Sequence, residues 1–196
     1  MRALPVWSRW ASLPGSGGAP ARPIGWGGLW LSAAAVLSGC APVDDWREVR
    51  VGAAGLTVRF PCRPEREQRP WSPSAAPRPA ELLSCRHQDA LYAVFSAELA
   101  GPDEVRAALL RLPAVTATRW HARLVDERLA VPVGATPWPQ SRWQHLQGQA
   151  DAVGPVSVQI QVFGHGLAVH QVTVVTPERA ASAAADTFLA GIRFVR

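Results

Sequence analysis

The clearest hydrophobic pattern in the chain is the alternation over residues 155–163. Apolar residues occupy the even positions from Val156 to Val162, and polar residues occupy the odd positions between them. A period of two is typical of a strand with one buried face. The glycine-rich segment 164–166 follows as a turn, and residues 167–175 return as a second strand. The pattern therefore predicts a β-hairpin here.

Weaker alternations predict the other strands. These are residues 46–51, 56–60, 81–87, 90–99, 123–131 and 141–151, with a short last strand or extended tail at 192–195. The dipeptide Gln88-Asp89 is the predicted turn of a second hairpin. The stretch from Pro61 to Pro79 is rich in Arg, Pro and Ser, so it is predicted to be a loop.

Two segments carry helix signals. Pro102 is followed by two acidic residues and an apolar stripe, which predicts a helix that Pro113 ends or kinks. Thr176 and Pro177 resemble an N-cap and a first helical residue, and Gly191 resembles the end of that helix. Together these elements predict an α+β fold, an antiparallel sheet flanked by helices.

An apolar run precedes the predicted domain. Residues 24–37 form 14 consecutive positions without a charge, too short to span a bilayer but suited to the core of a signal peptide. The alternative is a membrane helix that is not cleaved. The motif Leu37-Ser38-Gly39-Cys40 ends the run and resembles the lipobox of bacterial lipoproteins.

This resemblance implies the organisation of the whole chain. Cleavage between Gly39 and Cys40 would remove residues 1–39, and lipid chains of the palmitate type would be attached at Cys40. Residues 40–45 would then form a lipidated terminus and short tether, and residues 46–196 a single α+β domain. In such lipoproteins an aspartate directly after the cysteine tends to retain the protein in the inner membrane, and this chain has Ala41 at that position. The resemblance therefore implies the outer membrane, with the domain facing the periplasm.

Charge changes the picture little. Three of the 20 basic residues lie in residues 1–39, which leaves 17 arginines against 15 acidic residues. This near balance gives no indication of a nucleic-acid partner.

The remaining cysteines, Cys62 and Cys85, form an even pair. In an oxidising compartment such a pair usually forms a disulfide. The alternative is a metal site built from Cys62, Cys85 and His87, but no fourth ligand lies at a recognisable spacing. We therefore predict a disulfide, no metal and no cofactor.

The chain contains no established catalytic motif that survives cleavage. None of its five histidines is placed four residues from another on a predicted helix. We therefore predict a noncatalytic protein that binds an envelope protein or glycan. The alternative is an envelope hydrolase or transferase without a recognisable motif.

Tryptophans near arginines mark the candidate binding surface. Trp138 and Trp143 flank a loop beside Arg142, and Trp120 follows Arg119. Tryptophan and arginine are enriched at interfaces and at sugar-stacking sites. The alternative is that these tryptophans cap the core of the sheet; Trp138, between two prolines, is the one expected to be most exposed.

A second resemblance concerns the domain itself. A strand ending in Phe60-Pro61, a following Arg63-Pro64, a hairpin carrying Tyr92 and a final helix leading into 188–194 are similar to the PsbP/Mog1-like domains. This group implies a sheet sandwiched by helices, and its members serve as binding or assembly factors more often than as enzymes. Where the group usually has an aromatic residue, this chain has His170.

Overall fold

The computed structural model describes residues 46–71, 77–151, 153–179 and 183–194, which form an α+β fold of mostly antiparallel strands. This confirms the predicted class. The first half contains β1 (Arg47–Val51), β2 (Leu56–Phe60), β3 (Glu65–Trp71), β4 (Arg78–His87), β5 (Ala90–Glu98) and α1 (Pro102–Arg119). The second half contains β6 (Arg123–Leu129), β7 (Arg142–Ala150), β8 (Gly154–His165), β9 (Ala168–Pro177), α2 (Ala183–Ala190) and β10 (Arg193–Phe194).

The strands form two sheets. The large sheet has the order β3-β4-β5-β9-β8-β7-β6, and every neighbouring pair in it is antiparallel. The small sheet has the order β1-β2-β10. The central strands β5 and β9 are buried along almost their whole length. They carry apolar residues on both faces because both faces of the large sheet are covered.

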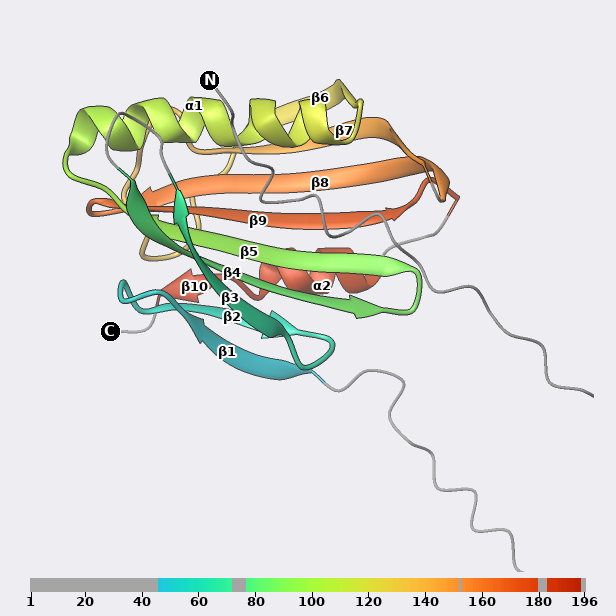
Figure 1. Cartoon of the computed structure of the whole chain (residues 1–196), viewed down its shortest axis with the longest axis horizontal. Helices are drawn as coiled ribbons and strands as arrows, with labels where there is room; N and C mark the ends of the chain where they lie inside the picture. Colours follow the sequence, from blue (N-terminus) through green and yellow to red (C-terminus); the bar gives the residue numbers. More distant parts are fainter. Residues whose placement is uncertain (1–45, 72–76, 152, 180–182, 195–196) are drawn as a thin grey trace, which may run out of the picture. The chain divides into compact units, whose positions relative to one another are not determined.

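The two faces of the large sheet are covered differently (Figure 1). Helix α1 packs on β8 and β9 on one face, where the Gln171 amide donates a hydrogen bond to Thr116 Oγ1 at 2.9 Å. The small sheet and α2 cover the other face. There, the ring of Phe188 lies 5.1 Å from Phe60 and 5.1 Å from Tyr92. The elements thus form three layers, with the large sheet in the middle.

Helix α1 continues through Pro113 to Arg119, so of the two predicted outcomes Pro113 does not end the helix. Proline lacks an N–H and costs the helix one hydrogen bond. Val105, Leu109 and Leu112 are buried on the same side of α1, and Pro113 is buried beside them. Their packing on the sheet outweighs the lost bond.

The predicted loop at 61–79 contains strand β3, and this part of the prediction was wrong. β3 pairs with β4 from Glu65 opposite Ser84 to Trp71 opposite Arg78. It is an edge strand, so it needs only one hydrogen-bonded neighbour and tolerates Pro70. Its residues are mostly exposed, which explains why no apolar alternation marks it.

Thr176 and Pro177 end β9 instead of starting a helix. They pair with Ser157 and Val156, because β8 is long enough to supply partners for them. The preceding turn also differs from its prediction. Gly164 and His165 belong to β8, and the chain turns at 166–167, where Gly166 has φ of +57°.

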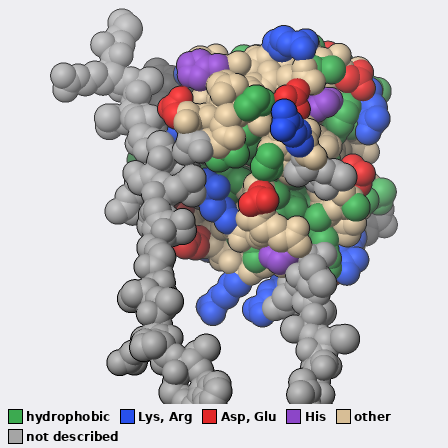
Figure 2. Space-filling view, turned by 90° about the vertical axis from the view of Figure 1, so that its right-hand side faces the viewer, with side chains coloured by type: hydrophobic (Ala, Val, Ile, Leu, Met, Phe, Trp, Pro, Cys, Tyr) green, Lys and Arg blue, Asp and Glu red, His purple; other side chains and the backbone are tan. Residues whose placement is uncertain are grey.

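Neither helix of the described residues is both long and apolar enough to cross a membrane. Figure 2 shows one end of the layers, where arginine, carboxylate and histidine side chains are scattered among apolar and neutral ones. The predicted cleavage site at Gly39 and Cys40, and the tether 40–45, lie outside the described residues.

Candidate functional site

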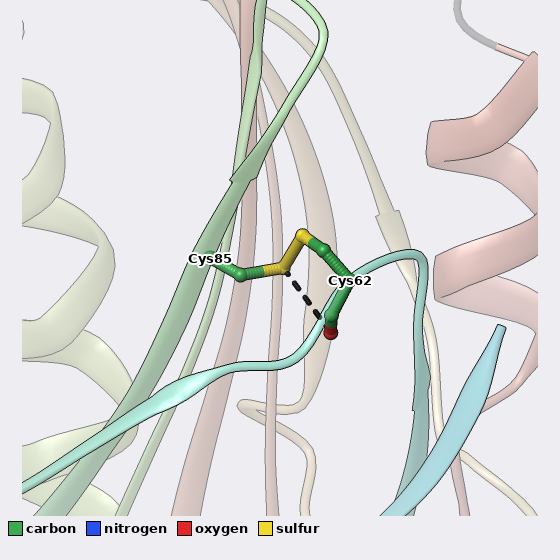
Figure 3. The surroundings of a disulfide bond; sticks show 2 residues. All are labelled: Cys62 and Cys85. Atoms are coloured by element: carbon green, nitrogen blue, oxygen red, sulfur yellow. Dashed lines mark hydrogen bonds between the residues drawn. A yellow bond between two sulfur atoms is a disulfide. The ribbon is translucent and has the colours of Figure 1, made fainter. Parts of the chain in front are cut away.

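A disulfide joins the two sheets. Cys62 follows β2 of the small sheet, and Cys85 lies in β4 of the large sheet (Figure 3). Their Cα atoms are 6.2 Å apart and their sulfurs are bonded. The predicted disulfide is confirmed, and both thiols are consumed by it, which removes them from the alternative metal site.

A cleft of about 450 Å³ opens between the β1–β2 turn and the large sheet, and we call it the interlayer cleft. This volume lies within the range of ligand-binding sites. Its lining includes polar groups from five segments of the chain. They are Gly52, Arg66, Glu81, Ser96, Glu98 and His165.

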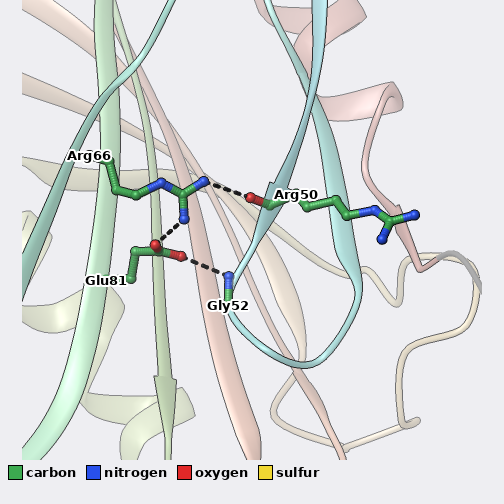
Figure 4. Close-up of polar contacts among 4 residues, drawn as sticks. All are labelled: Arg50, Gly52, Arg66 and Glu81. Atoms are coloured by element: carbon green, nitrogen blue, oxygen red, sulfur yellow. Dashed lines mark hydrogen bonds and ion pairs between the residues drawn. The ribbon is translucent and has the colours of Figure 1, made fainter.

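Glu81 fixes one wall of the interlayer cleft (Figure 4). The backbone N–H of Gly52 donates to Glu81 Oε2 at 2.7 Å, and Arg66 donates to Glu81 Oε1. The other guanidinium nitrogen of Arg66 donates to the carbonyl of Arg50 at 3.0 Å. Glu81 is only 8% exposed, so these bonds compensate a buried charge. They also hold the β1–β2 turn against the large sheet.

Gly52 is required at this position for two reasons. Its φ is +62°, which favours glycine, and a Cβ there would lie 2.6 Å from Ser96 Oγ. The turn can therefore approach the floor of the cleft closely. Sequence reasoning did not identify this site, although Glu81 within the apolar run 80–83 was a signal for it.

His170 lies in the core close to the cleft. It is paired with Ser96 across the sheet and has no exposed surface. Its ring lies 5.4 Å from Phe163 and 5.6 Å from Phe194, and neither ring nitrogen has a hydrogen-bond partner in the described residues. Burial, with a smaller effect of His165, lowers its pKa from 6.5 to about 3. His170 is therefore neutral at physiological pH.

Trp138 is less exposed than the sequence suggested. Its indole lies against Gly164 on the α1 side of the large sheet, and a Cβ at Gly164 would come within 2.8 Å of it. Its Nε1 is buried and has no hydrogen-bond partner in the described residues. The loop 133–139 is anchored by this residue.

The other predicted surface residues lie apart from one another. Arg142 lines a small groove beneath α1 and bonds Glu127 at 3.1 Å. Trp143, the next residue of the strand, points to the opposite face, where Arg128 stacks 4.2 Å from its ring. Trp120 caps the C-terminus of α1. The structure thus does not bring Trp120, Trp138, Arg142 and Trp143 together in one surface.

His145 and Ser157 form a pair of the kind that activates a serine nucleophile in some enzymes. His145 Nε2 lies 2.9 Å from Ser157 Oγ. However, Ser157 is in β8, which is hydrogen-bonded to β7 on one side and β9 on the other. The backbone N–H groups that could stabilise an oxyanion are therefore used within the sheet. The pair can fix the sheet surface but is poorly placed for acyl transfer.

Within the described ranges, no three His, Cys, Asp or Glu side chains gather as metal ligands. No protein-family model matches the chain, and no curated protein matches it. A crystal structure at 1.50 Å from Bacteroides thetaiotaomicron VPI-5482 is similar to it with a TM-score of 0.38 and 11% sequence identity. The similarity covers 76% of this chain and 48% of that protein, so the chain spans about half its length.

Proposed function

We propose that this protein is a lipid-anchored lipoprotein that faces the periplasm and binds an envelope partner without catalysing a reaction. The single observation that carries the proposal is the disulfide between Cys62 and Cys85. Disulfides belong to proteins of oxidising compartments. This agrees with an export signal that ends in the lipobox-like Leu37-Ser38-Gly39-Cys40.

The membrane and the finer fold are parts of the same proposal. Ala41 supports the outer membrane as the destination, and several acyl chains on Cys40 would anchor the protein stably. The order of layers, with α1 on one face of the large sheet and α2 on the other, supports a PsbP/Mog1-like sandwich. This likeness adds weight to a binding or assembly role.

The interlayer cleft is the proposed binding site. It has the volume of a ligand site, and its walls come from both sheets. The charged groups Arg66 and Glu81 are bonded to each other and to backbone atoms. They therefore shape the wall of the cleft, which suits recognition of a protein segment or a glycan.

The anchor is tested by the mass of the N-terminal peptide of protein purified from membranes. We expect a lipid-modified peptide that begins at Cys40, and loss of this modification in the Cys40→Ser variant. An unmodified peptide that begins upstream of Cys40 would contradict the proposal.

The site is tested by a photo-crosslinking amino acid placed at Ala53, an exposed residue of the cleft wall. The matched control carries the same amino acid at Val115, which is 43% exposed on α1. We expect defined crosslinked products in the envelope from position 53 and few from position 115. Equal patterns from both positions would contradict binding at the cleft.

A further inference from the structure

The outer face of the small sheet carries an excess of arginine. Residues that are paired across a sheet point to the same face, and the register pairs Glu48 with Arg59, and Thr57 with both Arg50 and Arg193. The inner face is formed by their buried neighbours in β1 and β2. Figure 4 shows the Arg50 guanidinium directed away from Glu81 and the large sheet. These five residues, with three arginines and one carboxylate, form what we call the basic sheet face.

The charges on the basic sheet face are only partly compensated within it. Arg193 is paired with Glu48, the single acidic residue of the face. Arg59 and Arg50 are exposed. In Figure 2, arginine side chains project along the lower edge of the molecule, the side on which β1 and β2 lie in Figure 1. The face therefore has a net positive charge at neutral pH.

A buried hydroxyl lies at the centre of this face. Thr57 is 1% exposed between its two arginine partners, and its Oγ1 has no hydrogen-bond partner in the described residues. A buried hydroxyl without a partner costs free energy. A phosphate oxygen that entered between the arginine stems would give Thr57 an acceptor, while the planar guanidinium groups could bind phosphate in a bidentate manner.

The position of the proposed anchor determines which layer lies near the membrane. Six residues lie between Cys40 and Arg47, the first residue of β1. Even fully extended, this segment spans at most about 25 Å. Of the three layers, the small sheet is the one whose first strand is joined to the anchor by this short segment.

We propose that the basic sheet face docks on the anionic phospholipid headgroups of the membrane that holds the lipid anchor. This inference rests on the proposed lipoprotein function. Each arginine near an anionic membrane surface raises the affinity of a protein for that membrane by a factor of about five. Docking would turn α1, on the far side of the large sheet, toward the periplasm.

The test uses the lipidated protein and labelling of arginines with phenylglyoxal, read out for each residue by mass spectrometry. The protein is inserted into vesicles of phosphatidylcholine, alone or with about one third phosphatidylglycerol. In the anionic vesicles we expect labelling of Arg50, Arg59 and Arg193 to fall about fivefold, and high salt should restore it. Arg106 on α1 and Arg123 on β6 serve as internal controls and should not change.

Unchanged labelling of the three arginines in anionic vesicles would overturn the proposal, and so would equal protection of Arg106 and Arg123. The same digest reports the mass of the N-terminal peptide. An unmodified Cys40 would contradict the anchor itself, whereas a lipidated protein with unchanged labelling would overturn only the docking surface.

A pair of variants provides a second measurement. In Arg50→Gln/Arg59→Gln, we expect the remaining Arg193 to lose its protection in anionic vesicles. The matched variant Arg106→Gln/Arg123→Gln removes the same charge from the far side and should leave that protection intact. Loss of protection in both variants would mean that total charge, and not this face, governs the orientation.

Discussion

Two buried polar residues of the large sheet illustrate how single side chains shape this protein. Glu81 accepts hydrogen bonds from Arg66 and from the Gly52 N–H. His170 has no such partners in the described residues, and burial lowers its pKa to about 3. The first residue contributes a fixed wall to the cleft, while the second makes stability depend on pH.

We expect the protein to lose stability as the pH falls below 6.5. The unfolded chain takes up a proton on His170 near its ordinary pKa of 6.5, whereas the folded protein does not until about pH 3. This difference amounts to about 2 kcal/mol at pH 5. Phenylalanine suits the contacts of this position with Phe163 and Phe194, so His170→Phe should fold. Between pH 7.5 and pH 5, its free energy of unfolding, measured with urea, should fall by about 2 kcal/mol less than that of the wild type.

The control for this prediction is His121→Asn, which removes an exposed histidine at a positive φ that asparagine tolerates. It should keep the pH dependence of the wild type. An identical pH dependence in His170→Phe and the wild type would show that His170 is not the responsible group.

A second prediction concerns the close contact between Gly164 and Trp138. In Gly164→Ala the new Cβ would lie 2.8 Å from the indole and 3.3 Å from Val105. Overpacking of this kind costs about 1–3 kcal/mol, to be measured by urea unfolding. In Gly101→Ala nothing lies within 4 Å of the new Cβ, so this control should lack the overpacking and lose only the small preference for glycine over alanine at the N-cap of α1. Equal effects of the two substitutions would contradict the packing argument.

At the scale of elements, the sequence predicted strands where apolar and polar residues alternate, which includes the exposed edge strand β6 as well as the buried strands. β8 alternates because one of its faces is only partly covered, and the hairpin of β4 and β5 is marked by Gln88, whose φ is +52°. β3 was missed because this edge strand, unlike β6 at the other edge, is almost wholly polar and contains Pro70. Thr176 and Pro177 carry helix-start chemistry, yet the ladder with β8 decides their structure.

The candidate site could be predicted only in part. The disulfide between Cys62 and Cys85 could be predicted from the sequence, since two cysteines in an oxidising compartment allow only one pairing. Local sequence could not show that Trp143 and Arg142 lie on opposite faces of one strand. Nor could it bring the β1–β2 turn to Glu81, because a contact between residues 29 positions apart depends on the packing of two sheets.

The disulfide gives a prediction at the same scale. We expect Cys62→Ser/Cys85→Ala to reduce the free energy of unfolding by about 3 kcal/mol, the chain-entropy cost of a loop of this length. Urea unfolding measures this. A reductant should lower the free energy of unfolding of the wild type by the same amount, and this control breaks the disulfide without changing any residue. A midpoint that does not change in reductant would show that the bridge contributes nothing.

At the scale of the whole molecule, the layers differ in how firmly each is held. β5 and β9 are buried on both faces and have a hydrogen-bonded neighbour on each side. β6 is an exposed edge strand. The small sheet contacts the large sheet through the core, the Glu81 bonds and the disulfide. Local stability should therefore decrease from the middle strands outward.

Hydrogen exchange of backbone amides can test this order. We expect β5 and β9 to exchange slowest, because their amides open only when the whole fold unfolds, and β6 and β3 to exchange fastest. Reduction of the disulfide should speed exchange in β5 and β9 only as far as it lowers the free energy of global unfolding. Exchange in β1 and β2 should rise further, since the bridge constrains the attachment of the small sheet to the large sheet. Uniform acceleration of all strands would instead mean that the two sheets unfold as one cooperative unit, and that the interlayer cleft cannot open without global unfolding.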